Sequence, residues 1–490
     1  MSKAYCCLVL LLFISFQLNA QVLPKEGAQL NYRLIGFSFD VKEKTKDCKL
    51  EIAKGDISTD EAFKKNIVKT YSCKESRIIA EVPAWGEHYT WRVSYINEQA
   101  QKVKSELHHF VTLMIPEVDT NNMRLRILES AKKFKDAYVM LDGNKIMYDM
   151  SGHPVWFLPC NDFNSAVTND LKVSGDGTIT FLNTQAYEIS YDGDTLFTAP
   201  NTGEVSGEKQ ENYHHEFTKL QNGHYMILGT QSAMWHLKTE NKFADTVNAE
   251  SGSKSPFATI IEYDKNGKLF WSWKSLSYFS IYGLPYYNPE TNPSKGIMDP
   301  HANSFYFDED NGFIYISFKN SNQVLKVKYP EGNVLNVYGE KYENGEKKVS
   351  DLIFCGQHGV KKSKKGYVYL FDNNSCADNL SSKVLKMEET GSVVNNLRIV
   401  WEYTCTVENG LPRKARKGGN VIELPDNCIF VSMGDSYSKL FIVDSNKQIY
   451  WSSVSEKWDS SDRKWNVMAE YRTSIIADKE KLERLIWRRR

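Results

Sequence analysis

A short turn followed by an apolar strand decides the fold, and its clearest copy is Leu220-Gln-Asn-Gly-His-Tyr-Met-Ile-Leu228. From about residue 116 onward the pattern recurs, with strands near residues 137, 178, 224, 313, 367 and 428. The second half of each unit ends in a hairpin and an aromatic residue, as in Tyr263-Asp-Lys-Asn-Gly-Lys-Leu-Phe-Trp271. Asn-Gly turns favour two-residue hairpins. Six four-stranded units predict a six-bladed β-propeller over residues 116–490, whose inner strands line a central channel.

A second region precedes these repeats. Residues 21–115 contain short segments that alternate apolar and polar positions, such as Leu30-Asn-Tyr-Arg-Leu34 and Tyr89-Thr-Trp-Arg-Val93. Such alternation is typical of half-buried strands, so this region predicts a small fibronectin-III-like β-sandwich. The whole chain is therefore expected to be all-β.

Residues 1–20 have the features of a signal peptide. Lys3 supplies a positive charge, Leu8 to Phe16 form a short apolar run, and the segment ends at Ala20. The run is too short to span a bilayer. We expect an exported protein, periplasmic or secreted, without a membrane anchor. Lys plus Arg and Asp plus Glu balance at 61 each, which gives no electrostatic argument for a nucleic-acid partner.

Export permits disulfides, and seven cysteines lie beyond the signal segment. Cys48 and Cys73 fall on neighbouring strands of the sandwich, where a bridge would staple the two strands. Cys355 and Cys376 flank one hairpin of the repeat region and are either bridged or two independent buried thiols. No Cys-x-x-Cys pair is present, which argues against a structural zinc site.

Three of the ten histidines stand ahead of the repeated turns. His215 lies eight residues before Gly223, and His358 lies eight residues before Gly366. His301 stands a little further ahead of its turn. A repeat can bring such residues to one axis, so we expect all three to face the channel. His214 is the alternative to His215. The alternatives for the set are structural hydrogen bonding and a zinc site, which no His-x-His spacing supports.

Four phrases of the chain resemble the bacterial arylsulfotransferase family, whose members use no PAPS donor. The phrases are His-His-Glu with Leu-Gln-Asn-Gly at 214–223, Asp-Pro-His-Ala-Asn-Ser at 299–304, Gln-His-Gly-Val with Tyr-Leu-Phe-Asp-Asn at 357–373, and Lys-Gly-Gly-Asn-Val-Ile-Glu-Leu-Pro-Asp-Asn at 417–427. The resemblance covers roughly residues 116–455, and the sandwich ahead of the repeats also fits the family.

The resemblance implies a six-bladed propeller that moves a sulfuryl group from a phenolic sulfate to a phenol without a cofactor or metal. It implies that His358 attacks sulfur and is transiently sulfated, and that His215 and His301 assist. The family has an arginine where this chain has Lys319. Lysine keeps the charge but loses the planar fork that grips two oxygens. Lys319 could instead be a solvated strand residue.

Without the family, the residues support the same chemistry. Neutral imidazole is a nucleophile near neutral pH, and sulfuryl transfer should resemble phosphoryl transfer in needing well-placed donors. The rival functions are aryl-sulfate hydrolysis and non-enzymatic ligand binding by the same channel. A thiol–disulfide oxidoreductase for folding and a second copy of the chain are the protein partners we expect.

Overall fold

The computed structural model describes residues 22–40, 46–114, 122–130, 132–159, 167–234, 254–283, 299–343, 346–349, 352–376, 381–392, 396–435 and 437–488. The predicted signal peptide and Cys160 lie outside these residues. The chain folds into two compact units, Met1–Met114 and Ile115–Arg490. The all-β prediction is confirmed. The described helices are α1 (Asp60–Lys65), η1 (Lys132–Phe134), α2 (Ser275–Tyr282) and α3 (Lys479–Trp487).

The first unit contains two sheets. One contains β1 (Ala28–Leu30), β8 (His108–Thr112), β6 (His88–Ile96), β3 (Lys46–Lys54) and β4 (Ile67–Ser72), with β7 (Lys102–Lys104) pairing β6; the other pairs β2 (Leu34–Ser38) with β5 (Arg77–Glu81). Aromatic rings pack between them, with centroids of Phe37 and Trp91 5.2 Å apart. The single strand predicted at 30–34 is wrong. The chain crosses between sheets there, with Tyr32 fully buried at the crossing.

The staple expected between Cys48 and Cys73 is not formed in the structure, which has both as half-buried thiols. The backbone N–H of Cys73 donates to the Cys48 carbonyl at 2.9 Å, so the two residues are neighbours. The Cys73 thiol lies 3.8 Å from the Tyr71 carbonyl and also interacts with the Cys48 thiol. Burial raises the pKa of Cys73 to about 12, which keeps this thiol protonated.

The second unit is built from antiparallel sheets. Three of them contain β12 (Pro154–Phe157), β11 (Ile146–Asp149), β10 (Tyr138–Leu141) and β36 (Thr473–Ile476); β16 (Thr195–Thr198), β15 (Ala186–Ile189), β14 (Ile179–Leu182) and β13 (Asn169–Val173); β20 (Leu269–Lys274), β19 (Lys254–Tyr263), β18 (Tyr225–Met234) and β17 (Asn212–Lys219).

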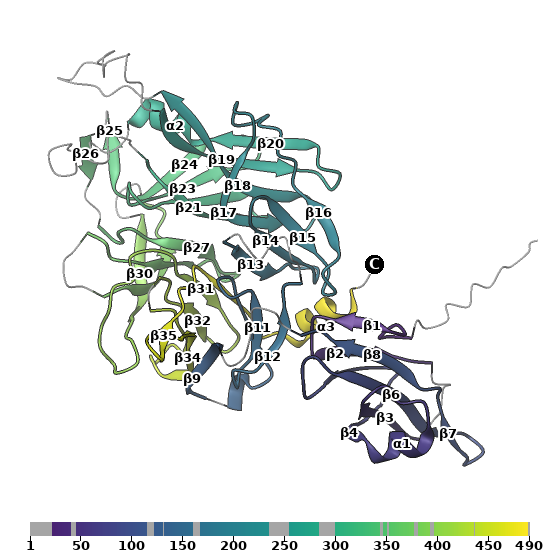
Figure 1. The fold of residues 1–490 in the computed structure, drawn as a ribbon. Helices are drawn as coiled ribbons and strands as arrows, with labels where there is room; N and C mark the ends of the chain where they lie inside the picture. Colours follow the sequence, from purple (N-terminus) through teal and green to yellow (C-terminus); the bar gives the residue numbers. More distant parts are fainter. Residues whose placement is uncertain are drawn as a thin grey trace, which may run out of the picture. The chain divides into compact units, whose positions relative to one another are not determined.

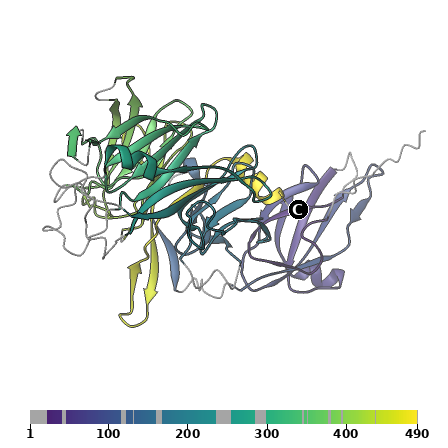
Figure 2. The ribbon, with the colours of Figure 1, turned by 90° about the horizontal axis from the view of Figure 1, so that it is seen from above.

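Three more sheets follow along the chain. They contain β24 (Val334–Gly339), β23 (Gln323–Lys328), β22 (Phe313–Phe318) and β21 (Ala302–Asp308); β30 (Leu397–Thr404), β29 (Lys383–Glu389), β28 (Val368–Asp372) and β27 (His358–Lys362); β35 (Lys464–Val467), β34 (Ile449–Asp459), β33 (Lys439–Val443), β32 (Ile429–Ser432) and β31 (Asn420–Glu423), with β9 (Met123–Glu129) pairing β34. A small hairpin pairs β25 (Lys341–Glu343) with β26 (Glu346–Val349). In Figure 2 the hairpin of β34 and β35, in yellow, projects beyond the sheets.

One strand from each of these six sheets contributes to a closed ring. The order is β36, β13, β17, β21, β27 and β31, and β31 lies against β36 again. Figure 1 shows the labelled strands of this ring turned toward a common centre. The first sheet takes its ring strand from far along the chain, since Tyr138 of β10 pairs with Ile476 of β36. The six strands predicted from the repeat are β10, β14, β18, β22, β28 and β32, each lying next to a ring strand.

The six strands that lie next to the ring strands are almost wholly apolar because other sheets pack on both of their faces. In β22, Ile314 and Ile316 pack into a core shared with the sheet of β18. Tyr315, between them in sequence, packs into the core shared with the sheet of β28. Successive side chains of a strand point to opposite faces, so a strand covered on both sides is apolar throughout. Full burial of one isoleucine contributes about 1.5–3 kcal/mol.

A disulfide joins Cys355 and Cys376, with Cα atoms 5.8 Å apart, which selects the first of the two alternatives for this pair. Cys355 lies just before β27 and Cys376 just after β28. The bond therefore fixes the segment that leads into His358. The backbone N–H of Ser375 also donates to the Cys355 carbonyl at 3.0 Å.

We expect the double substitution Cys355→Ser, Cys376→Ser to lower the free energy of unfolding by about 3 kcal/mol, the value typical of a loop of this length. Denaturant unfolding with and without reductant measures this. The wild-type midpoint should fall on reduction to that of the variant. The unfolding midpoint of the matched variant Cys48→Ser, Cys73→Ser should still fall on reduction. An unfolding midpoint of the wild type that does not change on reduction would contradict the Cys355–Cys376 assignment.

Candidate active site

A cavity of about 510 Å³ lies where the ring strands begin. The four residues singled out from the sequence all line it: His215, His301, Lys319 and His358. His214 and Tyr471 line it too, as do the acidic residues Asp142 and Glu470. The structure therefore brings together the four predicted residues, although they are spread over more than a hundred positions of the chain.

Irregular strands explain how histidines reach this cavity. In β17 the ladder pairs Tyr213 with Gly229 and then Phe217 with Ile227, so extra residues bulge out at His214 and His215. His215 has a φ of 65° and His301 a φ of 56°, a conformation that non-glycine residues rarely adopt. Bulges re-aim side chains, and such backbone strain collects at functional sites. Both features turn imidazoles toward the ring's axis.

His358 begins β27 and is buried. Its Nδ1 lies 2.7 Å from Oδ1 of Asn373 and 3.1 Å from the Gly356 carbonyl. The Asn373 amide is held in this orientation because its Nδ2 donates to the carbonyls of Ala415 and Gly418, each at 3.1 Å. Both neighbours of Nδ1 are acceptors, so Nδ1 carries the proton. Nε2 is then left with a free lone pair.

Electrostatics keep this imidazole neutral. Burial lowers the pKa of His358 to about 3, and the charges of Lys319 and Arg472 act in the same direction. The hydrogen bond to Asn373 opposes them. A neutral ring keeps its nucleophilic lone pair over the whole physiological range.

His215 and His301 form an edge-to-face pair with ring centroids 5.4 Å apart. Nδ1 of His301 lies 3.0 Å from Oδ2 of Asp299, and its backbone N–H donates to Oδ1 of the same carboxylate at 2.7 Å. Asp299 therefore fixes both the turn and the ring. Nδ1 of His215 lies 2.5 Å from Nδ1 of His214. Both members of this adjacent pair line the cavity, so the sequence alternative between them is not exclusive.

Lys319 follows directly on β22 and is half-buried. Its backbone N–H donates to the His301 carbonyl at 2.9 Å, which ties the two residues together. Its positive charge acts on His358, as the lowered pKa of that histidine indicates. These contacts place Lys319 in the histidine cluster, which a purely solvated strand residue would not be.

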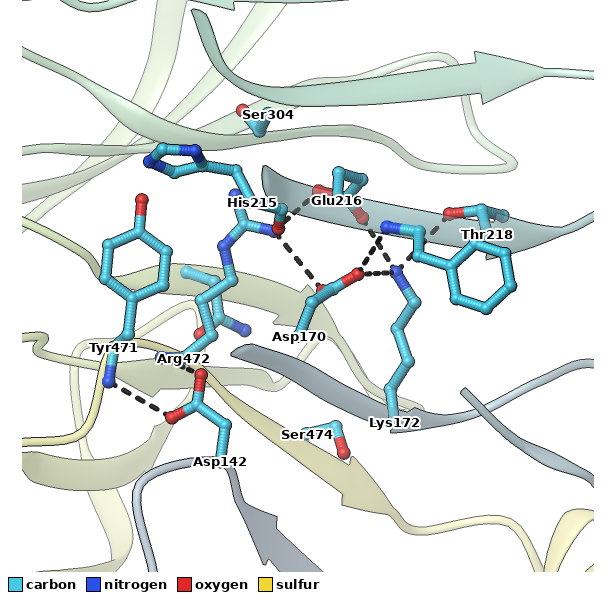
Figure 3. A network of polar contacts seen from close by, with 12 residues as sticks. Asp142, Asp170, Lys172, His215, Glu216, Thr218, Ser304, Tyr471, Arg472 and Ser474 are labelled. Atoms are coloured by element: carbon cyan, nitrogen blue, oxygen red, sulfur yellow. Dashed lines mark hydrogen bonds and ion pairs between the residues drawn. The ribbon is translucent and has the colours of Figure 1, made fainter. Parts of the chain in front are cut away.

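Arg472 was not anticipated from the sequence, although its guanidinium lies next to His215 (Figure 3). Its Nη1 donates to the His215 carbonyl at 2.8 Å and to Oε2 of Glu216 at 2.6 Å. Its Nη2 donates to the Asn303 carbonyl. One buried guanidinium thus holds the backbone at two of the irregular strands.

Arg472 belongs to a buried ionic cluster. Glu216 also pairs with Lys172 at 2.8 Å and with Lys361 at 3.0 Å. Asp170 accepts from Lys172 at 2.6 Å and from Arg472 at 3.3 Å. Burial alone would raise the pKa of Glu216, but the three cations hold it well below its usual range. The cluster holds three cations against two carboxylates. Burial raises the pKa values of Asp142 and Glu470 on the cavity wall, which reduces their negative charge, so the balance suits an anionic ligand.

Tyr471 is the second residue that the sequence did not reveal. Its ring centroid lies 5.4 Å from that of His215 and 6.1 Å from that of His358. Its hydroxyl is buried and has no hydrogen-bond partner among the described residues. Figure 3 shows the hydroxyl on the same side as the His215 ring. A buried donor left unpaired beside the histidines is available to a bound ligand.

The described part of the chain does not contain the cluster of ligands that the zinc alternative requires. No group of three His, Cys, Asp or Glu side chains in these ranges is placed to hold a metal ion.

Among the described helices none is both long and apolar enough to cross a membrane.

Similar solved structures are distant. A protein of unknown function from Bacteroides caccae is 14% identical with a TM-score of 0.41, covering 70% of this chain and 99% of its own. An auxiliary nutrient binding protein from Bacteroides ovatus is 8% identical with a TM-score of 0.34, covering 86% and 83%. A putative 6-phosphogluconolactonase from Bacteroides uniformis is 13% identical with a TM-score of 0.33, covering 70% and 100%. Likenesses at this level indicate no function.

No curated protein matches the sequence. A family model does: the one described as Arylsulfotransferase (ASST) matches residues 93–401. The matched range contains His215, His301, Lys319 and His358. It also covers more than half of the chain, so this protein belongs to the arylsulfotransferase family.

Proposed function

We propose that this protein moves a sulfuryl group from an aryl sulfate to a phenol by a ping-pong route through sulfated His358. The observation that carries the proposal is the pair of acceptors at Nδ1 of His358, Asn373 and Gly356, which leaves Nε2 unprotonated. Membership of the arylsulfotransferase family supports aryl sulfate as donor and phenol as acceptor.

In the first half-reaction the Nε2 lone pair attacks sulfur and forms the N–S bond. The S–O bond to the aryl group breaks, and its electron pair leaves with the phenolate. Positive charge grows on the ring and is stabilised by the carbonyl oxygens of Asn373 and Gly356. In the second half-reaction the acceptor oxygen attacks sulfur, the N–S bond breaks, and the phenol proton is released.

The neighbours of His358 supply charge stabilisation. Sulfuryl transfer concentrates charge on peripheral and departing oxygens, so catalysis depends on donors already in place. Lys319, His215 and His301 line the same cavity and take this role. The unpaired hydroxyl of Tyr471 adds a fourth donor.

The larger architecture is also part of the proposal. We take the ring of six sheets as a six-bladed propeller and the first unit as a fibronectin-III-like sandwich, with domains at 21–115 and 116–490. Removal of residues 1–20 would release the protein to the periplasm or the medium.

Incubation with an aryl sulfate, with and without a phenol, separates the candidate functions. Sulfate transfer to the phenol supports the proposal. Release of inorganic sulfate at an equal rate in both would indicate a hydrolase, and binding without turnover would indicate a ligand-binding protein.

His358→Ala should abolish both transfer and the burst of phenol that precedes the steady state, because it removes the attacking nitrogen. His215→Ala or His301→Ala should slow transfer by about 10²–10³-fold, the effect of losing one donor. Stopped-flow detection of the released phenol measures the burst. His153→Ala, an exposed residue whose side chain is 65% accessible, is the control. Full transfer by His358→Ala would exclude the covalent route.

Lys319→Arg should preserve or raise transfer, since it restores the family's residue and its two-pronged grip. Lys319→Met should lower kcat/KM by about 10²–10³-fold, because it removes the positive charge while nearly keeping the length of the side chain. Steady-state kcat/KM with an aryl sulfate and a phenol decides this. Loss of activity in Lys319→Arg would show that the cavity is adapted to lysine and to a different substrate.

The pH profile should reflect the lowered pKa of His358. A neutral ring is lost only as pH falls through the folded-state value of about 3, so the burst rate should stay flat from about pH 8 to about pH 5. Asn373→Asp places a carboxylate against Nδ1, raises the pKa and moves the acid limb to higher pH. Asn374→Asp, which changes the adjacent buried amide, should leave the limb in place. A limb near 6.5 in the wild type would contradict the assignment.

A further inference from the structure

A second, smaller cavity of about 190 Å³ adjoins the first. It is lined by Asn212, Thr230 and Phe257 together with His214, His215 and His301, which also line the larger cavity. These three histidines therefore line both cavities. The proposed chemistry gives no role to the smaller cavity or to Thr230.

A continuous line of hydrogen bonds crosses this wall. Thr230 lies in β18, and its Oγ1 is 2.7 Å from Nε2 of His214. Nδ1 of His214 is 2.5 Å from Nδ1 of His215. Two ring nitrogens at that distance share one proton, so one ring donates and the other accepts. The tautomers of the two histidines are thereby linked, and Nε2 of His215 holds a proton only in one of the two arrangements.

Both rings remain neutral, as tautomer exchange requires. Burial and the charge of His301 lower the pKa of His214 to about 4. Burial, His214 and Arg472 hold the pKa of His215 well below its ordinary value. The charged or titratable groups that face the pair include His301, Asp299, Arg472, His358 and Tyr471.

We propose that Thr230 and His214 form a proton relay that resets His215 between the two half-reactions, with the smaller cavity as its entrance. This inference rests on the proposed sulfuryl transfer. Ping-pong transfer needs an acid for the departing phenolate and then a base for the arriving phenol. A neutral imidazole offers one of these at a time, and a change of tautomer converts it from acid to base.

The proton balance closes over one cycle. As the S–O bond breaks, the departing oxygen takes the proton from Nε2 of His215. The Nδ1 proton of His214 passes to Nδ1 of His215, and the Thr230 hydroxyl proton passes to Nε2 of His214. Water in the smaller cavity reprotonates Thr230 and is left as hydroxide until the second half-reaction returns a proton to it. When the acceptor phenol gives its proton to Nε2 of His215, each transfer runs in reverse. His214 and Thr230 act through His215 and are positioning residues.

A leaving-group comparison tests the relay. Phenyl sulfate releases a basic phenolate that needs a proton, whereas 4-nitrophenyl sulfate releases an anion that leaves unaided. In the burst of phenol that reports the first half-reaction, Thr230→Val and His214→Phe should be about 10²-fold slower with phenyl sulfate, the contribution of general acid catalysis, and little changed with the nitrophenyl donor. Thr230→Ser keeps the hydroxyl and should match the wild type with both donors.

Two further readouts separate a relay from a structural effect. The double variant Thr230→Val, His214→Phe should be no slower than either single variant, because the residues act as one unit. Equal losses with both donors, or a Thr230→Val enzyme that matches the wild type with phenyl sulfate, would overturn the relay. Transfer from both donors that survives His358→Ala would instead reject the proposed function, which is a distinguishable result.

Discussion

The site depends on one buried guanidinium. Arg472 stands just ahead of β36 and donates to carbonyls of β17 and β21, and it pairs with carboxylates on β13 and β17. Four ring strands are thus joined at the level where His215 leaves its strand. Breaking a buried ionic contact typically costs about 3–5 kcal/mol, because an uncompensated charge stays inside. The cluster therefore sets the separation of the strands, and the cavity above it inherits that geometry.

The sequence predicted what local patterns encode. The six repeated strands appear as β10, β14, β18, β22, β28 and β32 because a strand covered on both faces must be apolar. The equal spacing of His215 and His358 from their glycine turns placed both on ring strands. Asn373 lay within a phrase already noted, yet its role needed the three-dimensional view of which atom faces Nδ1.

Arg472 and Tyr471 could not be found in the same way. Every other sheet has its ring strand just ahead of its turn, but the first sheet takes β36 from more than three hundred residues away, so the repeat carries no local signal for it. Bulges were equally hidden, since their extra residues look like ordinary strand. For Cys48 and Cys73 the strand pattern correctly predicted proximity but not a bond: the two thiols interact and remain free in the structure.

The position of β36 near the end of the sequence also affects when the site can form during synthesis. β36 follows every other strand in the sequence, so a ribosome completes five sheets and most of the sixth before Arg472 exists. Until then Glu216, Asp170 and the two lysines lack the arginine that pairs with both carboxylates. The backbone at His215 and Asn303 also lacks the hydrogen bonds from Arg472. A chain that folds from its beginning thus acquires its chemistry last. Such an order keeps the cluster of histidines unformed until the end of synthesis.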